Sequence, residues 1–415
     1  MYLIVKIPKF KYTIQQPASK VLPTSKIHTL SVYRMVDIMS IYLIFQFYKT
    51  INFAFCILHF ALHKIMNTFG HIFRLTTFGE SHGPAIGGVI DGCPAGIRID
   101  FKAIQHRLAL RSPQNVAGAT TRNEADRVEF LSGIYEGKTL GTPIAFFVRN
   151  KDVRSEDYAE LQHIYRPGHA DYTYDMRYGI RDHRGGGRAS ARTTVAQVVA
   201  GTIAEQFLQA MGITIEAYVD QIGPILIPDQ TDGNDVDSSP LRCPDKFTEA
   251  LWLDLIEQLR EEGDTIGGAV RCSIKGVPAG VGEPIFNKVQ AQLASAMMSI
   301  PAAKGFEYGL GMAAAAAQGS ESNDEMLIRK GKVKFNTNRA GGILGGITTG
   351  ESIDFRVAFK PVSSLSQPQR TITDSKQPIA LQISGRHDVC VAPRAVAVVR
   401  AMAALTLIDQ LLCKN

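Results

Sequence analysis

A short internal repeat is the feature that most constrains the fold of this 415-residue chain. IDGCPAGIRIDFKAIQHRLA at Ile90–Ala109 resembles IKGVPAGVGEPIFNKVQAQLA at Ile274–Ala294, 184 residues later (274 − 90). Both segments begin with a Pro-Ala-Gly turn, continue through a short extension and end in a helical pattern. The repeat therefore predicts two related α+β halves that pack together.

Hydrophobic periodicity predicts helices and strands in irregular alternation. Helices are expected over FKAIQHRLAL after a capping Asp100, and over 191–211, 247–263, 286–298 and 395–413. Gly212 and Gly263 are the expected stop signals of two of these helices. Strands are expected at 85–90, 144–148, 269–274 and 353–359. The regular βαβ alternation of a Rossmann sheet is missing, which favours an α+β fold.

The first 65 residues differ in composition from the rest of the chain. They hold eight of the 45 Lys and Arg residues but only one of the 39 acidic residues, Asp37. From Met66 onward the charges nearly balance, so no general electrostatic footprint for nucleic acid is expected. Polar residues interrupt the apolar stretch at 38–62, which disfavours a membrane span. We expect 1–65 to be an extension outside the fold, either translated upstream sequence or a targeting segment, and 66–415 to be the domain.

The six cysteines are scattered along the chain. None forms a C-x-x-C pair or lies at zinc-finger spacing from a histidine. This distribution predicts reduced thiols in a cytoplasmic protein that holds no metal.

The densest group of charged residues is RPGHADYTYDMRYGIRDHRGGGRASAR, residues 166–192. It contains six arginines, two histidines and only three acidic residues, and Gly185–Gly187 precede a predicted helix. A glycine-rich turn at a helix N-terminus presents free N–H groups to an anion, and arginine binds phosphate or carboxylate oxygens in pairs. A solvated, salt-bridged loop is the alternative for a charge run alone, but the triple glycine favours anion binding.

Two further segments are candidates for a site. NRAGGILGGITTGES at 338–352 is rich in glycine but lacks G-x-G-x-x-G and a following helical pattern. It predicts either close approach of the backbone to a flat ligand or tight turns between strands. SGRHDVC at 384–390 precedes a helical segment, so Asp388 is a candidate N-cap, and a catalytic role for it needs other support.

FGESHG, residues 78–83, fits the G-x-S-x-G pattern of the serine hydrolase nucleophile elbow. An elbow needs a strand, a strained turn and then a helix at once. Here Pro84 and a second strand-like segment follow, which disfavours Ser81 as a nucleophile. His82 in a glycine-flanked turn is better interpreted as an acid–base group or a phosphate partner.

These motifs together resemble those of chorismate synthases. Five segments occur in the order of that family, from about Met66 to the C-terminus. They are FGESHGPAIGGVIDGCPAG, residues 165–192, AGGILGGITTG, KPVSS and GRHDVC. The resemblance implies a β-α-β sandwich of two related halves. It also implies a 1,4-anti elimination of phosphate from 5-enolpyruvylshikimate 3-phosphate, which gives chorismate and requires reduced FMN. A homotetramer is the implied assembly, and NADPH is the implied candidate reductant.

The resemblance also implies roles for individual residues. His82 is expected to protonate the leaving phosphate, and His169 to act on the reduced flavin near its N1. Asp388 is expected near flavin N5, while Ser81 and Ser190 support these groups. Several other residues are expected to contact the flavin, partly through backbone atoms: Arg188, Ala189, Ser190, Ala302, Gly345, Lys360, Pro361, Val362, Ser363, Ser364 and Arg386.

One segment departs from the family pattern. After the first helix of the domain the family usually has R-R-R-P-G-x-S-R, whereas this chain has LRSPQNVA at Leu110–Ala117. Arg111 survives and is the residue expected to contact substrate or NADPH. The loss of the other cations predicts weaker binding of substrate anions. A weakened or non-catalytic flavin- or phosphate-binding paralogue is therefore the alternative function, followed by a serine hydrolase that uses Ser81.

Overall fold

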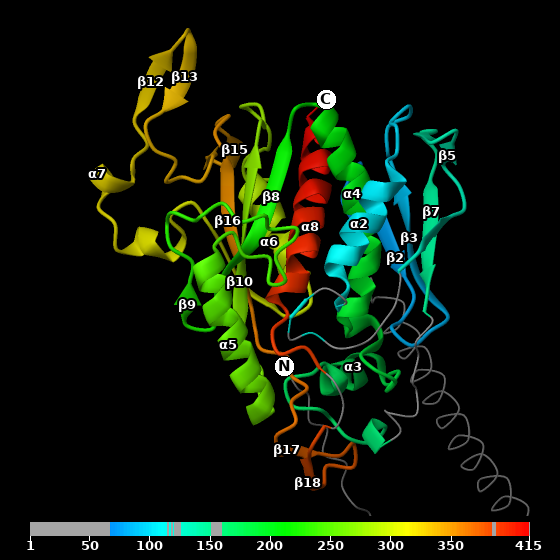
Figure 1. Cartoon of the computed structure of the whole chain (residues 1–415). Coiled ribbons are helices and arrows are strands. Elements are labelled where there is room, and N and C mark those ends of the chain that lie inside the picture. Colours follow the sequence, from blue (N-terminus) through cyan, green and yellow to red (C-terminus); the bar gives the residue numbers. More distant parts are fainter. Residues whose placement is uncertain are drawn as a thin grey trace, which may run out of the picture. The chain divides into compact units, whose positions relative to one another are not determined.

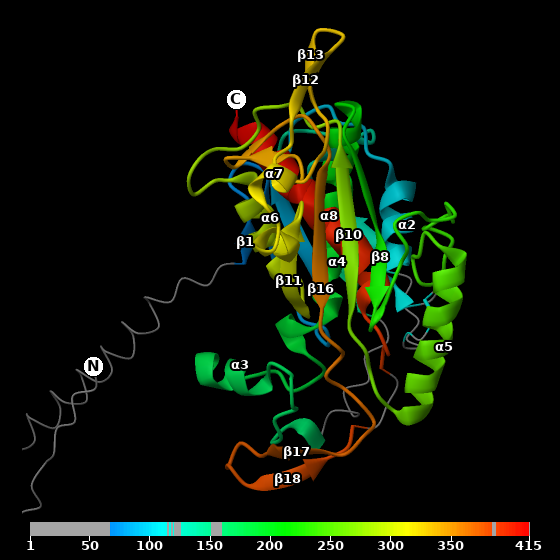
Figure 2. The same ribbon diagram turned by 90° about the vertical axis from the view of Figure 1, so that its left-hand side faces the viewer.

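Two antiparallel sheets enclose a layer of helices in the computed structural model of this protein (Figure 1). The structure describes residues 67–113, 116–117, 119, 126–150, 160–383 and 387–414. The extension predicted at 1–65 therefore lies outside the described residues. Seen after a quarter turn, the second sheet lies in front of the helices and the first sheet lies behind them (Figure 2). This is the β-α-β sandwich that the motifs predict.

The first half contains one five-stranded sheet and two helices. The sheet has the order β1-β2-β3-β7-β4, built from β1 (Thr68–Phe69), β2 (Arg74–Phe78), β3 (Ala85–Asp91), β7 (Ile144–Arg149) and β4 (Val128–Phe130). The helices of this half are α2 (Phe101–Arg111) and α4 (Thr194–Ala210). Asp100 caps α2 by accepting hydrogen bonds from the backbone N–H groups of Lys102 and Ala103, as predicted.

The second half also contains one five-stranded sheet and two helices of the central layer. Its sheet has the order β11-β16-β10-β8-β9, built from β11 (Ala303–Tyr308), β16 (Ile353–Phe359), β10 (Gly268–Lys275), β8 (Thr214–Ile222) and β9 (Ile225–Leu226). The helices of the central layer from this half are α6 (Val289–Met298) and α8 (Ala392–Cys413). Strand β10 pairs with β16 from Gly268 opposite Phe359 to Ile274 opposite Ile353.

The two halves share one topology. The first runs β2, β3, α2, β4, β7, α4, and the second runs β8, β10, α6, β11, β16, α8. The corresponding strands also neighbour each other in the same order, β2-β3-β7-β4 against β8-β10-β16-β11. The Pro-Ala-Gly repeat falls at the equivalent strand-to-helix connections, β3 to α2 and β10 to α6. The prediction of two related halves is confirmed by this correspondence.

Smaller elements decorate the sandwich. Helix α5 (Lys246–Glu262) ends at Gly263 in the left-handed conformation and packs beside β9, where the Trp252 indole N–H donates to the Ile225 carbonyl at 3.1 Å. The others are α3 (Asp171–Tyr178), α7 (Gly319–Ser322), and the hairpins β5 (Ile134–Tyr135) with β6 (Lys138–Thr139), β12 (Met326–Arg329) with β13 (Lys332–Phe335), β14 (Ile343–Leu344) with β15 (Ile347–Thr348), and β17 (Gln369–Ile372) with β18 (Pro378–Leu381).

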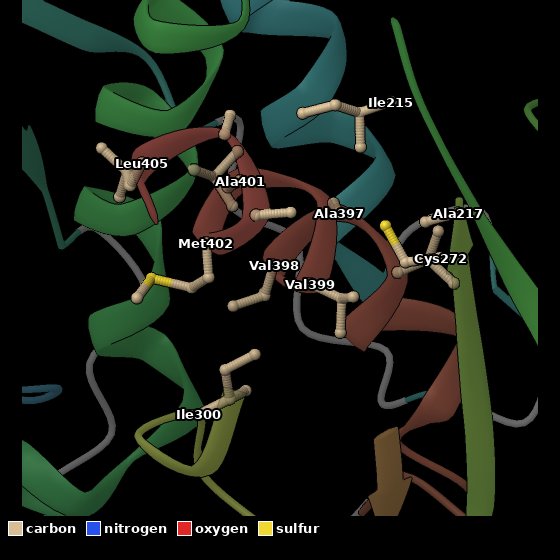
Figure 3. Packing of buried hydrophobic residues seen from close by; sticks show 14 of the residues in the cluster. Ile215, Ala217, Cys272, Ile300, Ala397, Val398, Val399, Ala401, Met402 and Leu405 are labelled. Carbon is tan, nitrogen blue, oxygen red and sulfur yellow. The ribbon is translucent and has the colours of Figure 1, made fainter. Parts of the chain in front are cut away.

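The core is centred on α8, which is apolar on all sides and nearly all buried. Its residues pack against Ile215, Ala217 and Cys272 of the second sheet and against Ile300 (Figure 3). Helices α4 and α8 approach so closely that a Cβ on Gly201 would lie 2.4 Å from the Cβ of Ala401. Among the described residues α8 alone has the length and hydropathy of a membrane span, and 83% of that window is buried inside the protein. Burial in the core accounts for its composition.

Some predicted boundaries were wrong. The helix expected over 191–211 begins at Thr194, and two 3-10 turns, Gly187–Ala189 and Ala191–Thr193, separate it from the glycine run. The helix expected from residue 286 begins at Val289, and the last one begins at Ala392 with Pro393 in its first turn. All four predicted strands are present.

Candidate active site

The predicted site segments gather at one end of the sandwich. The β2–β3 turn, the residues around α3, the segment after β16 and the segment before α8 all lie at the lower end in Figure 1. Helices α4 and α8 start at this end, so their N-termini point toward it. Strands from both halves thus deliver side chains and free backbone N–H groups to one region.

The β2–β3 turn carries Ser81 and His82. Its first residue, Gly79, has φ +90°, and a Cβ there would lie 2.2 Å from the Ala85 carbonyl oxygen, so only glycine fits. Ser81 is 1% exposed and His82 7% exposed, and the Ser81 Oγ lies 3.0 Å from the His82 Nδ1. The turn joins two antiparallel strands and no helix follows it. The geometry of a hydrolase elbow is therefore absent, as the sequence predicts.

The glycine run of 185–187 packs directly against this turn. A Cβ on Gly185, which has φ +64°, would lie 2.3 Å from the His82 Cε1 and 3.0 Å from the Ser81 Oγ. The Ser81 N–H also donates to the Gly187 carbonyl at 3.4 Å. Because Gly185 has no side chain, the His82 imidazole can occupy the space beside its α-carbon.

His169 is tied to the same glycine through Arg166. The Arg166 Nη2 donates to the Gly185 carbonyl at 2.7 Å and lies 3.1 Å from the His169 Nδ1. Asp171, the first residue of α3, lies 2.9 Å from that Nδ1 and accepts two further hydrogen bonds from the Arg166 side chain. Burial would raise the pKa of Asp171, but the hydrogen bonds from Arg166 and His169 outweigh it and hold that pKa well below its usual range.

The segment after β16 contacts the loop that carries His169. The Lys360 Nζ donates to the Gly168 carbonyl at 3.0 Å and contacts the Ser363 Oγ at 2.5 Å, and that hydroxyl donates to the same carbonyl at 2.7 Å. The Lys360 backbone N–H donates to the carbonyl of Ala302, which has φ +69°, an unusual value for alanine. Burial lowers the pKa of Lys360, and the positive charge of Lys304 lowers it further. Lys360 and Ser363 thus hold the loop residue that precedes His169, and Ala302 is hydrogen-bonded to Lys360.

A chain of hydrogen bonds links the His82 turn to the first half's polar core. The Asn150 Nδ2 donates to the carbonyls of Glu80 and Gly83, at 3.1 and 2.8 Å, and so holds both ends of the turn. The Asn150 Oδ1 accepts from the Arg192 Nε at 3.1 Å, and Arg192 is ion-paired with the buried Asp126.

The same chain continues to Asp388. Asp126 also accepts from Arg111 at 2.6 Å, the Arg111 carbonyl accepts from the Arg394 Nε at 3.0 Å, and Arg394 is ion-paired with Asp388. Burial would raise the pKa of Asp126, but the positive charges of Arg111 and Arg192 outweigh it and lower that pKa. Groups from both halves are therefore held in one polar network.

Two predicted residues have roles that their motifs do not reveal. Asp388 is not the cap of α8, because the N-cap is Val391, so the simple structural interpretation of this aspartate is wrong. Arg111 is 3% exposed and held by Asp126, and burial lowers its pKa to about 10 although Asp126 opposes the change. In this arrangement its guanidinium lies in the interior, and the contact expected with substrate or NADPH stays a prediction.

Arg188, Ala189 and Ser190 form the 3-10 turn region in front of α4. The Arg188 guanidinium donates to the Gly79 carbonyl at 3.1 Å and to the Thr77 Oγ1 at 2.7 Å, so its side chain braces the end of β2. The Ser190 Oγ accepts from the Arg192 N–H at 3.2 Å and caps the second turn. The side chains of Arg188 and Ser190 are thus engaged within the protein, and the backbone contacts expected with a flavin stay a prediction.

The structure does not bring Gly345 together with the other predicted residues. It lies in the turn between β14 and β15, which precedes β16, whereas Lys360 to Ser364 follow that strand. Seven strand residues separate the two places, about 23 Å of extended chain. Figure 1 shows the hairpin at the opposite end of the sheet from α3. Arg386 lies outside the described residues.

Other site residues were missed by the sequence analysis. Arg166 and Asp171 stand within the RPGHAD motif, where the spacing of His169 and Asp171 gave a usable signal. Asn150, Asp126 and Arg394 gave none, because single polar residues distant in sequence become partners only through the fold. The buried thiols Cys93, Cys243, Cys272 and Cys390 are free, and burial raises the pKa of each, which makes them poor nucleophiles.

Comparisons with known proteins identify this arrangement. The chorismate synthase family matches residues 73–412. A chorismate synthase of Porphyromonas gingivalis is 53% identical over 355 residues, 84% of this chain and 96% of that protein. One from Parabacteroides distasonis is 52% identical and covers 84% of this chain and 99% of its own length. A crystal structure of a chorismate synthase superposes with a TM-score of 0.67 at 32% identity, covering 83% of this chain and 93% of that one. The chain therefore belongs to the chorismate synthase family, whose members are lyases of aromatic amino acid biosynthesis.

Proposed function

We propose that this protein converts 5-enolpyruvylshikimate 3-phosphate to chorismate by 1,4-anti elimination of phosphate, with reduced FMN as cofactor. The observation that carries this proposal is the common attachment of two histidines to Gly185. His82 packs on the glycine's α-carbon side, and His169 is joined to its carbonyl through Arg166. Loss of a phosphate and a ring hydrogen needs two proton-handling groups at one site, and imidazoles are suited to that role near neutral pH.

Four residues are assigned roles in the reaction. His82 gives a proton to the departing phosphate, and Ser81 orients the His82 ring through its contact with Nδ1 at 3.0 Å. His169 holds or exchanges a proton at Nε2, the ring nitrogen that points away from Asp171. Asp388, ion-paired with Arg394 at the start of α8, provides the carboxylate of the second half.

The residues present fit an anionic flavin. Lys360 is hydrogen-bonded only to neutral oxygens within the described part of the chain, so its positive charge has no carboxylate partner there. Lys304 adds a second positive charge beside it. Ala302, Lys360, Pro361, Val362, Ser363 and Ser364 would hold the cofactor together with the backbone of Arg188, Ala189 and Ser190. When bound, reduced FMN supplies electron density to the substrate and recovers it after phosphate leaves.

A homotetramer is the proposed assembly. The β12–β13 hairpin projects from the second sheet (Figure 1), and its paired Ile328 and Val333 are 77% and 62% exposed. An isolated two-stranded hairpin is marginally stable in water, and exposed apolar side chains favour contact with another surface. Light scattering should give a mass of four chains, and Ile328→Lys should lower it. A monomeric wild-type protein would contradict the assembly.

The free, buried thiols favour a cytoplasmic location.

The test of the function is phosphate release from 5-enolpyruvylshikimate 3-phosphate, measured without oxygen and with reduced FMN. His82→Ala and His169→Ala should each lower turnover about 10²- to 10⁴-fold, as loss of a general acid or base does, while the unfolding midpoint stays close to that of the wild type. His163→Ala is the matched control, because that histidine is exposed and pairs with Asp374 outside this cluster. Normal turnover by both site variants would refute the assigned roles.

The two alternatives predict different results. A serine hydrolase would be labelled at Ser81 by a phosphonate ester, but Ser81 is buried and lies between two strands. A non-catalytic paralogue would bind FMN tightly and release no phosphate. The replaced cations of 110–117 motivated that idea, yet Leu110 and Val116 are buried and Ala117 packs against the core. The comparisons favour neither alternative.

A further inference from the structure

We propose that Asp171 and Arg166 fix the proton of His169 on Nδ1, so that His169 exchanges protons only through Nε2. Asp171 and Arg166 are thereby positioning residues for the reaction. The structural part of this inference stands on the contacts around Asp171 and on its ionised carboxylate, and only its kinetic part rests on the proposed function. Two groups contact the Nδ1, the Arg166 Nη2 and the Asp171 Oδ1, and counting the available hydrogens decides which atom is the donor.

Both hydrogens of the Arg166 Nη2 are taken by oxygen atoms. Its Nη2 carries two N–H groups and has three neighbours, the Gly185 carbonyl at 2.7 Å, the Asp171 Oδ1 at 2.8 Å and the His169 Nδ1 at 3.1 Å. The two oxygens are nearer and one of them is charged, so they take both hydrogens. Arg166 therefore has no hydrogen left to donate to the imidazole.

The remaining partner of the His169 Nδ1 is Asp171. The Asp171 Oδ1 lies 2.9 Å from it, and an ionised carboxylate only accepts hydrogen bonds. Asp171 is ionised, because its pKa is held well below the usual range by Arg166 and His169 against the opposing effect of burial. The Nδ1 must then be the donor, whether the ring is neutral or protonated.

This arrangement is held firmly, because Arg166 and Asp171 are both buried and paired. The side chains of Arg166 and Asp171 are both 5% exposed, and Arg166 also donates through its backbone N–H and its Nε to the Asp171 Oδ2. Arg181 lies 3.5 Å from the Asp171 Oδ1 and adds a second positive charge. The pair cannot rotate without leaving buried charges unpaired, which is costly. Water is also largely excluded from the Nδ1 side of the ring.

The two nitrogens of the His169 imidazole therefore have different roles. Nδ1 orients the ring through Asp171, and Nε2 has no hydrogen-bond partner among the described residues. In the neutral ring Nε2 carries the lone pair, ready to take a proton from a ligand and return it. The Gly185 carbonyl, held by the same Arg166 Nη2, also couples this orientation to the loop that packs on His82.

The test is ¹⁵N NMR of the full-length apoprotein labelled at histidine Nδ1, recorded over an acid-to-alkaline pH series. The His169→Gln variant identifies the resonance among the ten histidines. We expect a protonated Nδ1 throughout the series, because the Asp171 carboxylate accepts that hydrogen. A resonance that moves far downfield as the ring becomes neutral would show a bare Nδ1 and would overturn the proposal. Besides the wild type, only the His169→Gln variant used for the assignment has to fold.

Asp171→Asn provides the kinetic arm, with Asp374→Asn as the matched control. Asp374 also contacts a histidine Nδ1, that of the exposed His163, outside this cluster. We expect Asp171→Asn to expose a downfield Nδ1 population and to lower kcat about 10²-fold with little change in KM, since the ring is misprotonated and not missing. The control should change neither. A loss of kcat with an unchanged Nδ1 resonance would overturn the positioning role. Absence of turnover in a wild type with protonated Nδ1 would refute the proposed function and leave the tautomer assignment standing.

Discussion

Replacing Gly185 with alanine should disable the enzyme through a single methyl group. The added Cβ would lie 2.3 Å from the His82 Cε1 and 2.4 Å from its Nδ1, while ordinary contacts begin at 3.4 Å. The imidazole must therefore retreat by about 1.1 Å (3.4 − 2.3), and a displacement of about 1 Å at a reacting group costs about 10²-fold in rate. The left-handed φ of +64° adds roughly 1–2 kcal/mol of strain for a residue with a Cβ.

Gly212→Ala separates these two effects. Gly212 follows α4, has φ +79°, and a Cβ there meets nothing within 4 Å. It carries the same strain without the clash, so both variants should lose about 1–2 kcal/mol in the free energy of urea unfolding. Only Gly185→Ala should lose about 10²-fold in phosphate release. If the two variants retained equal activity, packing of Gly185 on His82 would not be what positions that imidazole.

Three further outcomes are expected. Asp409→Asn should lower the free energy of unfolding by about 2–3 kcal/mol, because the buried Asp409 carboxylate accepts the backbone N–H groups of residues 71–73, and unchanged urea stability would contradict this. Asn150→Ala should lower kcat about tenfold or more, since it releases both ends of the His82 turn; an unchanged kcat would show that the turn holds itself. Folding lowers the pKa values of Asp126 and Asp171, so their stabilisation is complete above about pH 4, the unfolded value, and is lost as the pH falls through the folded values. Urea unfolding across an acid pH series should show this decline, and Asp126→Asn should flatten it.

The fold was predictable where local patterns are strong. The Pro-Ala-Gly repeat pointed to two related halves because it marks the same strand-to-helix connection in each. Asp100 and Gly263 set the ends of their helices as expected, since caps act locally. Strands β8 and β11 and the β12–β13 hairpin escaped prediction because their stability comes from neighbours far away in sequence. The start of α4 was misplaced because two 3-10 turns precede it.

The site was predictable in its motifs and not in its connections. His82, His169 and Lys360 come from motifs and meet at one end of the sandwich. Their positions are held by Arg166 and Asn150, whose hydrogen bonds reach carbonyl groups 19 and 67–70 residues away. Backbone acceptors leave no trace in side-chain patterns. Arg111 shows a further limit of the sequence, which does not reveal that this cation is ion-paired with Asp126 inside the protein.

The tight crossing of α4 and α8 has a consequence for synthesis. Helix α8 supplies the apolar surface on which α4 and the second sheet both rest, and it is the last element of the described chain. While a ribosome is still translating residues before 392, the strands of both sheets have been made. The helix at the centre of their common core, α8, has not. Nascent chains should therefore stay protease-sensitive and dependent on chaperones until the final helix emerges. A premature stop codon only about two dozen codons from the end should leave no folded remnant of either half.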